Sequence, residues 1–169
     1  WMDITEEAWD RIMAVNVKGL WLASKAVVPA MQTRQQGSVV NISSNMAFNG
    51  GLTMMHYVTS KAAVVGFSRV LARELGGDNI RVNTVAPGML TEGVSVNIPS
   101  KQQEEYKDYC ALSRAGRPEE VAELVKRDGI TVVPLRFSWS PEMRKGIRRV
   151  PNGARLLVIQ SRGDFERHA

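Results

Sequence analysis

The 169-residue sequence predicts an α/β fold built on a parallel sheet. Helical and strand-like segments alternate along the first 125 residues, and this alternation is typical of crossover connections. Parallel strands need such crossovers, whereas antiparallel strands can be joined by short turns. The hydrophobic fraction of 44% and the charged fraction of 23% are ordinary for a globular protein, which excludes a disordered, collagen-like or low-complexity chain.

The first predicted helix extends from about residue 6 to residue 36 and follows Thr5, a residue type that favours helix N-termini. Its apolar positions recur mostly every three to five residues, which is the spacing of one helix face. Asn16 and Gly19 are weak helix formers inside this run, so we expect an irregular turn there. We expect Gly37 to end the helix.

Two predicted strands flank a second predicted helix. The β-branched run at 38–42 predicts the first strand, and the Ser, Asn and Gly residues within 43–55 predict a loop after it. An apolar stripe predicts a helix over 56–75. The run at 80–85 predicts the second strand, and a Pro-Gly turn closes it.

The region beyond the second strand is less regular. We expect 89–112 to be irregular apart from a polar helix near 101–109, and Pro118 opens a short helix at its first turn. Two strands are too few for a parallel sheet, which is buried on both faces. Further strands are therefore expected upstream of the sequence, in another chain, or at 130–133 and 156–159.

Charge divides the chain near residue 126. Residues 1–125 carry 12 Lys or Arg and 13 Asp or Glu, a net charge of −1, whereas 126–169 carry 10 and 4, a net charge of +6. Such a basic segment is consistent with a module that binds nucleic acid or an anionic surface, or with a solvated face. We expect no nucleic-acid partner, because only the residues around 144–149 form a dense cluster.

Cysteine usage and hydropathy predict a cytoplasmic protein with no membrane partner. The single cysteine, Cys110, cannot form an internal disulfide, which excludes a stapled secreted scaffold. No stretch approaches the 18 apolar residues of a transmembrane helix. The sequence lacks a signal-peptide pattern and begins with Trp1 rather than Met, which favours a fragment of a longer protein.

The residues that carry chemistry cluster around the second helix. Tyr57 and Lys61 are four residues apart, so their side chains share one helix face. A cation beside a phenol favours the phenolate and produces a tyrosine that can exchange a proton near neutral pH. The pair alone could equally be an ordinary exposed helix pair. Ser44, at the end of a strand, favours a catalytic site, because parallel sheets bind ligands at that edge.

A larger pattern runs through five segments: Val15-Asn-Val-Lys-Gly19, Val40-Asn-Ile-Ser-Ser44, Tyr57-Val-Thr-Ser-Lys61, Arg81-Val-Asn-Thr-Val-Ala-Pro-Gly88 and the stretch 114–125. Asn16 precedes Ser44 by 28 residues, Ser44 precedes Tyr57 by 13, and Tyr57 precedes Lys61 by 4. The residues and spacings resemble the short-chain dehydrogenase/reductase family, and most closely its 3-oxoacyl-carrier-protein reductases. The resemblance covers residues 3–125 and leaves the protein N-terminally incomplete relative to that family.

The resemblance implies that residues 1–125 are the catalytic part of such a domain, with an unmatched Arg-rich tail at 126–169. The implied fold is α/β, a partial Rossmann-like doubly wound parallel sheet missing the N-terminal phosphate-binding strands. The implied function is an NAD(P)-dependent oxidoreductase that interconverts a carbonyl and an alcohol by hydride transfer, with NAD or NADP as cofactor. Its partners would be a small-molecule carbonyl or alcohol substrate and further copies in a homodimer or homotetramer, with no metal.

The resemblance also implies a role for each site residue. Tyr57 would be the general acid/base, and Lys61 would stabilise its phenolate and hydrogen-bond the nicotinamide ribose. Ser44 would orient the substrate carbonyl or alcohol, and Asn16 would hold a water that links Lys61 to solvent. Three further residues would lie near the nicotinamide, just after the second strand: Pro87, Gly88 and Met89.

Three departures from the family pattern leave a second interpretation open. The Thr-Gly-x-x-x-Gly-x-Gly phosphate loop and the Asn-Asn-Ala-Gly strand are absent from the sequence. Glu92 stands where the family usually has a threonine. After Val125 the family's ending is replaced by the Arg-rich tail, which indicates a frameshifted gene, a fusion or an altered terminus, or else a divergent ending that supplies edge strands. The alternative function is therefore an inactive truncated fragment that cannot bind cofactor.

Overall fold

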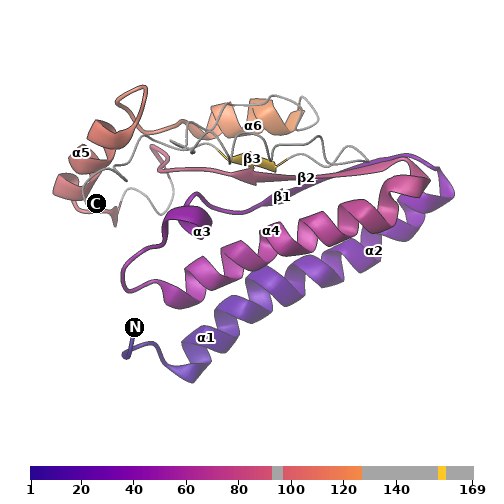
Figure 1. The fold of residues 1–169 in the computed structure, drawn as a ribbon, viewed down its shortest axis with the longest axis horizontal. Helices are drawn as coiled ribbons and strands as arrows, with labels where there is room; N and C mark the ends of the chain where they lie inside the picture. The colour runs from indigo at the N-terminus through magenta and orange to yellow at the C-terminus, as the bar shows by residue number, and fades with distance from the viewer. Residues whose placement is uncertain (93–96, 127–155, 159–169) are drawn as a thin grey trace, which may run out of the picture.

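The computed structural model describes residues 1–92, 97–126 and 156–158. Their strands form one parallel sheet in the order β1 (Gly37–Ile42), β2 (Ile80–Ala86) and β3 (Leu156–Val158). Figure 1 shows α2 (Gly19–Thr33) and α4 (Met55–Leu75) below the sheet and α6 (Pro118–Lys126) above it. Helices on both faces are the doubly wound arrangement that the family resemblance implies.

The strand predictions agree with this sheet. Strands β1 and β2 appear within one residue of the expected bounds, and the possible strand at 156–159 is β3 over three residues. The possible strand at 130–133 lies outside the described residues. Residues of β1 and β2 pair in step from Gly37 with Ile80 to Ile42 with Val85, so the two strands reach their carboxyl ends together.

The first predicted helix is three consecutive segments: α1 (Glu6–Met13), a π-helical turn η1 (Ala14–Lys18), and α2. The Thr5 side chain accepts a hydrogen bond from the amide of Ala8 over 3.2 Å and caps α1, as predicted. The expected irregularity is the π-helical turn, with Asn16 at its centre. Turns of this kind insert a residue into a helix and are frequent at functional sites.

The prediction that Gly37 ends the first helix is wrong. Helix α2 ends at Thr33, Gln35 takes a positive φ of 50° in the turn, and Gly37 is the first residue of β1. A Cβ atom at Gly37 would lie 2.6 Å from the sulfur of Met31. The glycine is therefore needed for the close approach of β1 to α2. In the sequence alone, such a glycine cannot be distinguished from one that ends a helix.

The predicted loop at 43–55 is wrong in part, because it contains the short helix α3 (Met46–Asn49). The polar helix expected near 101–109 is α5 (Ser100–Tyr109), and Pro118 opens α6 as expected. The second helix is confirmed as α4, and the short 3-10 turn η2 (Gly76–Asp78) follows it.

Two apolar clusters hold the layers together. One lies between the sheet and the helices below it, and the other joins the sheet to α6 through Val85 and Leu124. The first cluster consists of Val28, Ala72, Leu75, Ile80 and Val82. None of the helices in the described residues is long and apolar enough to span a membrane.

Candidate active site

The carboxyl ends of β1 and β2 are joined by backbone hydrogen bonds. The amide of Ser43 donates to the carbonyl of Val85 over 2.7 Å, and the amide of Asn45 donates to the carbonyl of Pro87 over 3.0 Å. The segments that leave the two strands therefore start side by side. Ser43, Ser44 and Asn45 are all buried, so this edge of the sheet is a polar environment shielded from water. Parallel sheets place their ligands at this edge.

Helix α4 brings Tyr57 and Lys61 to the same edge. The Lys61 Nζ atom lies 5.8 Å from the centroid of the Tyr57 ring and donates to the carbonyl oxygen of Ile42, the last residue of β1, over 3.1 Å. That distance is within the range of cation–π attraction. Burial lowers the pKa of the Lys61 ammonium, because the charged form loses hydration. The predicted pair is thus a half-buried lysine next to a phenol at a strand end.

Asn16 reaches this site through Ser60. The Asn16 side-chain nitrogen donates to the Ser60 hydroxyl over 2.9 Å, and that hydroxyl donates to the carbonyl oxygen of Tyr57 over 2.8 Å. Ser60 is fully buried, at 0% exposure. The sequence analysis missed Ser60, although a small polar residue between Tyr57 and Lys61 was an available signal. The π-helical turn is therefore fastened to the turn of α4 that begins at Tyr57.

The two serines after β1 have different partners. The Ser43 hydroxyl donates to the carbonyl oxygen of Lys61 over 2.7 Å, which fastens the strand end to α4. The Ser44 hydroxyl accepts from the amide of Met46 over 3.2 Å at the start of α3. Ser44 was chosen over Ser43 by spacing, and Ser43 is the serine whose hydroxyl is committed to the α4 backbone. The proposed substrate role of Ser44 remains a prediction.

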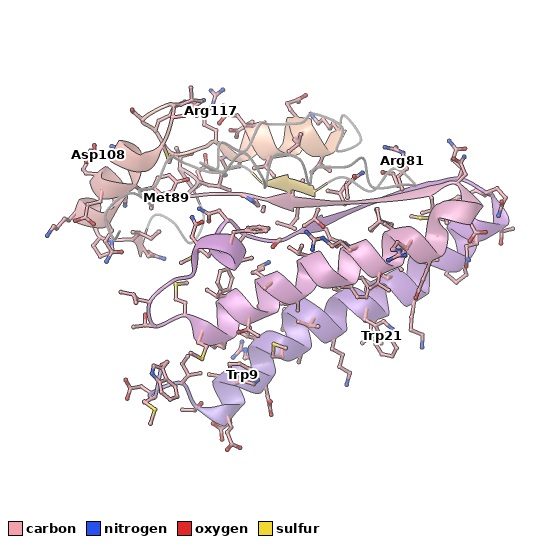
Figure 2. All side chains as sticks on the ribbon, viewed as in Figure 1. Trp9, Trp21, Arg81, Met89, Asp108 and Arg117 are labelled. Carbon is pink, nitrogen blue, oxygen red and sulfur yellow. The ribbon has the colours of Figure 1, made fainter. Side chains whose placement is uncertain are left out.

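Residues 87–91 follow β2 and are held at several points. The amide of Met89 donates to the Tyr106 hydroxyl of α5 over 3.0 Å, and its carbonyl accepts from the amide of Gly116 over 2.9 Å. Figure 2 shows Met89 at the carboxyl end of β2, on the side of α5. Pro87, Gly88 and Met89 therefore form a fixed segment beside the polar edge of the sheet. Tyr106 had no sequence signal, because its partner is a backbone amide 17 residues away.

The segment before α6 is also fixed. Arg114 makes a two-pronged ion pair with Glu120, at 2.6 Å and 2.9 Å, and the amide of Arg117 donates to the same carboxylate over 2.8 Å. These hydrogen bonds lower the pKa of Glu120 to about 2. Within the described ranges, no group of three or more His, Cys, Asp or Glu side chains could hold a metal ion.

Residues 1–126 match a protein family described as Enoyl-(Acyl carrier protein) reductase. The chain is 41% identical over 120 residues to the 3-oxoacyl-(acyl-carrier-protein) reductase FabG of Thermotoga maritima, covering 71% of this chain and 49% of that protein. It is 44% identical over 126 residues to dehydrogenase/reductase SDR family member 4 of Oryctolagus cuniculus, covering 73% and 48%. The chain spans about half the length of these curated relatives.

A solved structure agrees with the sequence matches. The 3-oxoacyl-(acyl-carrier protein) reductase of Brucella melitensis with bound NAD superposes with a TM-score of 0.69 and 27% identity, covering 93% of this chain and 53% of that chain. The family match extends over well more than half of the chain, and both curated relatives align with more than two thirds of it. The chain therefore belongs to the short-chain dehydrogenase/reductase family.

Proposed function

We propose that residues 1–125 are the catalytic part of an NAD(P)-dependent oxidoreductase that interconverts a carbonyl and an alcohol by hydride transfer. The observation that carries the proposal is the position of Lys61 Nζ, 5.8 Å from the Tyr57 ring at the carboxyl end of β1. A lysine ammonium beside a phenol at a strand end fits a general acid/base pair. The names of the relatives, which include a 3-oxoacyl reductase, support the carbonyl chemistry.

The described residues suit the nicotinamide and ribose end of such a cofactor. A lysine ammonium carries three donors, and Lys61 uses one of them on Ile42, which leaves donors for a ribose hydroxyl. The fixed backbone of Pro87, Gly88 and Met89 provides the neighbouring surface. When bound, the nicotinamide supplies or accepts the hydride. The NAD in the Brucella melitensis reductase supports this cofactor class, and the proposal covers either NAD or NADP.

The proton is handled by this chain's own residues. In the reducing direction Tyr57 gives its hydroxyl proton to the substrate oxygen, and Lys61 stabilises the phenolate that remains. The buried Ser44 hydroxyl orients the substrate oxygen beside Tyr57. The Asn16 amide, which Ser60 orients, holds a water that links Lys61 to solvent. In the oxidising direction the same residues act in reverse.

Turnover by a hybrid protein would test this function. The Thermotoga maritima relative supplies the residues before Trp1 and after Val125, so that a phosphate loop accompanies residues 1–125. Tyr57→Phe is expected to lower kcat about 10²- to 10⁴-fold, because it removes only the proton donor. Nucleotide affinity, measured by calorimetry, should change little. Thr59→Ala, at an exposed position two residues along α4, is the matched control. Full turnover by Tyr57→Phe would overturn the proposal.

We also propose that the protein forms a homodimer or a homotetramer. The outer side of α1, η1, α2 and α4 bears a groove of about 670 Å³. Trp21 and Val70 are 46% and 57% exposed on these helices, and Figure 2 shows Trp21 on the side of α2 away from the sheet. A Cβ atom at Gly66 would meet nothing within 4 Å, so a second copy could approach closely there. The groove is lined by Asp10, Met13, Ala14, Val17, Lys18, Trp21 and Phe67.

Two other features bear on the proposed function. The single cysteine supports a cytoplasmic location. The absence of a Thr-Gly-x-x-x-Gly-x-Gly loop from these 169 residues supports the second candidate, a chain that is inactive by itself because it cannot hold the cofactor's pyrophosphate. The basic cluster at 144–149 lies outside the described residues, and we propose no nucleic-acid or membrane partner for it.

A further inference from the structure

Tyr106 connects α5 to the segment that follows β2. Its hydroxyl accepts the amide hydrogen of Met89 over 3.0 Å, so a side chain on α5 determines where a backbone group of the site lies. Figure 1 shows α5 beyond the carboxyl end of β2, on the α6 side of the sheet. The contact therefore joins two residues that are 17 positions apart in the sequence.

The backbone of Met89 is held from two directions. Tyr106 binds its amide, and the amide of Gly116 donates to its carbonyl over 2.9 Å. The amide of Thr91 in turn donates to the carbonyl of Gly116 over 2.8 Å, which gives a parallel bridge between Leu90 and Gly116. Removal of one anchor leaves a polar group unsatisfied while the other still holds the segment near its place. A substitution that removes the Tyr106 hydroxyl should thus leave the Met89 segment held by its hydrogen bond to Gly116.

Two ion pairs on α5 are local to that helix. Lys107 pairs with Glu104 over 2.6 Å, and Lys101 lies 3.9 Å from Glu105, all on exposed surface within the helix. Burial and the neighbouring Cys110 raise the pKa of Tyr106 to about 12, so its hydroxyl stays neutral across the range in which enzymes work. A neutral phenol keeps the same hydrogen bond at every such pH.

We propose that Tyr106 is a positioning residue, whose hydroxyl fixes the Met89 backbone so that the segment 87–89 presents a preformed surface to the nicotinamide. This inference rests on the proposed function and adds a specific residue to it. Preformed backbone lowers the cost of ordering on binding. Loss of the hydroxyl should therefore weaken nucleotide binding more than it slows the chemical step, because Tyr57 and Lys61 are untouched.

The test compares Tyr106→Phe with Glu104→Gln in the hybrid protein. Glu104→Gln breaks an exposed ion pair on the same helix and should leave both kinetic constants unchanged. We expect Tyr106→Phe to raise KM for the nicotinamide nucleotide about three- to tenfold, the loss of one neutral hydrogen bond, with kcat within about twofold. In the 169-residue chain itself, hydrogen exchange of the Met89 amide should become faster in Tyr106→Phe and stay unchanged in Glu104→Gln.

An unchanged nucleotide KM in Tyr106→Phe would overturn the inference, and so would a fall in kcat with no rise in KM. Tyr57→Phe, measured in the same hybrid, separates this failure from that of the proposed function. If Tyr57→Phe loses turnover while Tyr106→Phe behaves as the unsubstituted hybrid, only the positioning role of Tyr106 is wrong. If Tyr57→Phe keeps turnover, the proposed function itself is wrong.

Discussion

The side-chain amide of Asn16 donates a hydrogen bond of 2.9 Å to the hydroxyl of Ser60, a residue 44 positions later in the chain. The same hydroxyl donates to the carbonyl of Tyr57, so one buried oxygen joins the π-helical turn η1 to the start of α4. This hydrogen-bond chain thereby fixes the position of the two helical segments relative to each other. A serine at 60 contributes to the site although it is not expected to contact substrate.

Ser60→Ala should destabilise the hybrid by about 0.5–1.5 kcal/mol, because the half-buried Asn16 amide loses its hydrogen-bond acceptor. Chemical denaturation measures the change in the free energy of unfolding. Thr59→Ala, at the exposed neighbouring position, should change that free energy by less than about 0.5 kcal/mol. The double variant with Asn16→Ala should show a coupling of about 0.5–3 kcal/mol. Simple additivity of the two substitutions would mean that the hydrogen bond contributes nothing.

Lys61→Ala should impair both nucleotide binding and turnover, unlike Tyr57→Phe, which should impair turnover alone. The lysine is proposed to bind the ribose and to stabilise the phenolate, so its loss affects both steps. Calorimetry and steady-state kinetics on the hybrid separate the two effects. A Lys61→Ala variant with normal nucleotide affinity would contradict the ribose contact.

Lys61 also predicts a pH dependence of stability. Burial lowers the folded-state pKa of its ammonium below the unfolded-state value, so the unfolded chain binds more protons between the two values. The free energy of unfolding should therefore rise with pH from the lowered pKa up to the ordinary lysine value. Lys61→Met removes the titrating group, and denaturation at a series of alkaline pH values should show a flatter profile. Identical slopes in the two proteins would contradict the burial of this charge.

Val70→Glu should dissociate the proposed homo-oligomer. Val70 is 57% exposed on α4, and a carboxylate there would be buried without a partner if a second copy covers this face. Sedimentation velocity of the hybrid at micromolar concentration measures the change. Lys107→Gln, on α5 beyond the opposite face of the sheet, is the control and should keep the assembly of the parent (Figure 1). A Val70→Glu protein that assembles normally would place the interface elsewhere.

The unaltered 169-residue chain should show no calorimetric binding of NADH or NADPH at micromolar concentrations. Its described residues are proposed to contact the nicotinamide and ribose end alone, and the 169 residues contain no glycine-rich loop for the pyrophosphate. The hybrid, which carries such a loop, should bind. Micromolar binding by the unaltered chain would show that other residues, among them the basic ones of 126–169, hold the phosphates.

The sequence by itself determined the order of the longer helices and strands, though not the short helix α3, and it placed Tyr57 and Lys61 on one helix face. Both depend on local periodicity: residues four apart on a helix share a face wherever that helix lies. The irregular turn at Asn16 was predictable for the same reason, since weak helix formers act within their own turn. The family resemblance then implied roles for these residues, which stay predictions.

Only the tertiary structure decided which groups meet. Three hydrogen bonds of the site join different elements. They connect Asn16 with Ser60, Ser43 with the Lys61 backbone, and Tyr106 with the Met89 amide. A backbone amide or carbonyl is the same group at every position, so no sequence pattern singles out the one at Met89 as the partner of a distant phenol. A helical pattern can be recognised from residues close together in the sequence. These contacts, in contrast, form only because packing brings distant elements together.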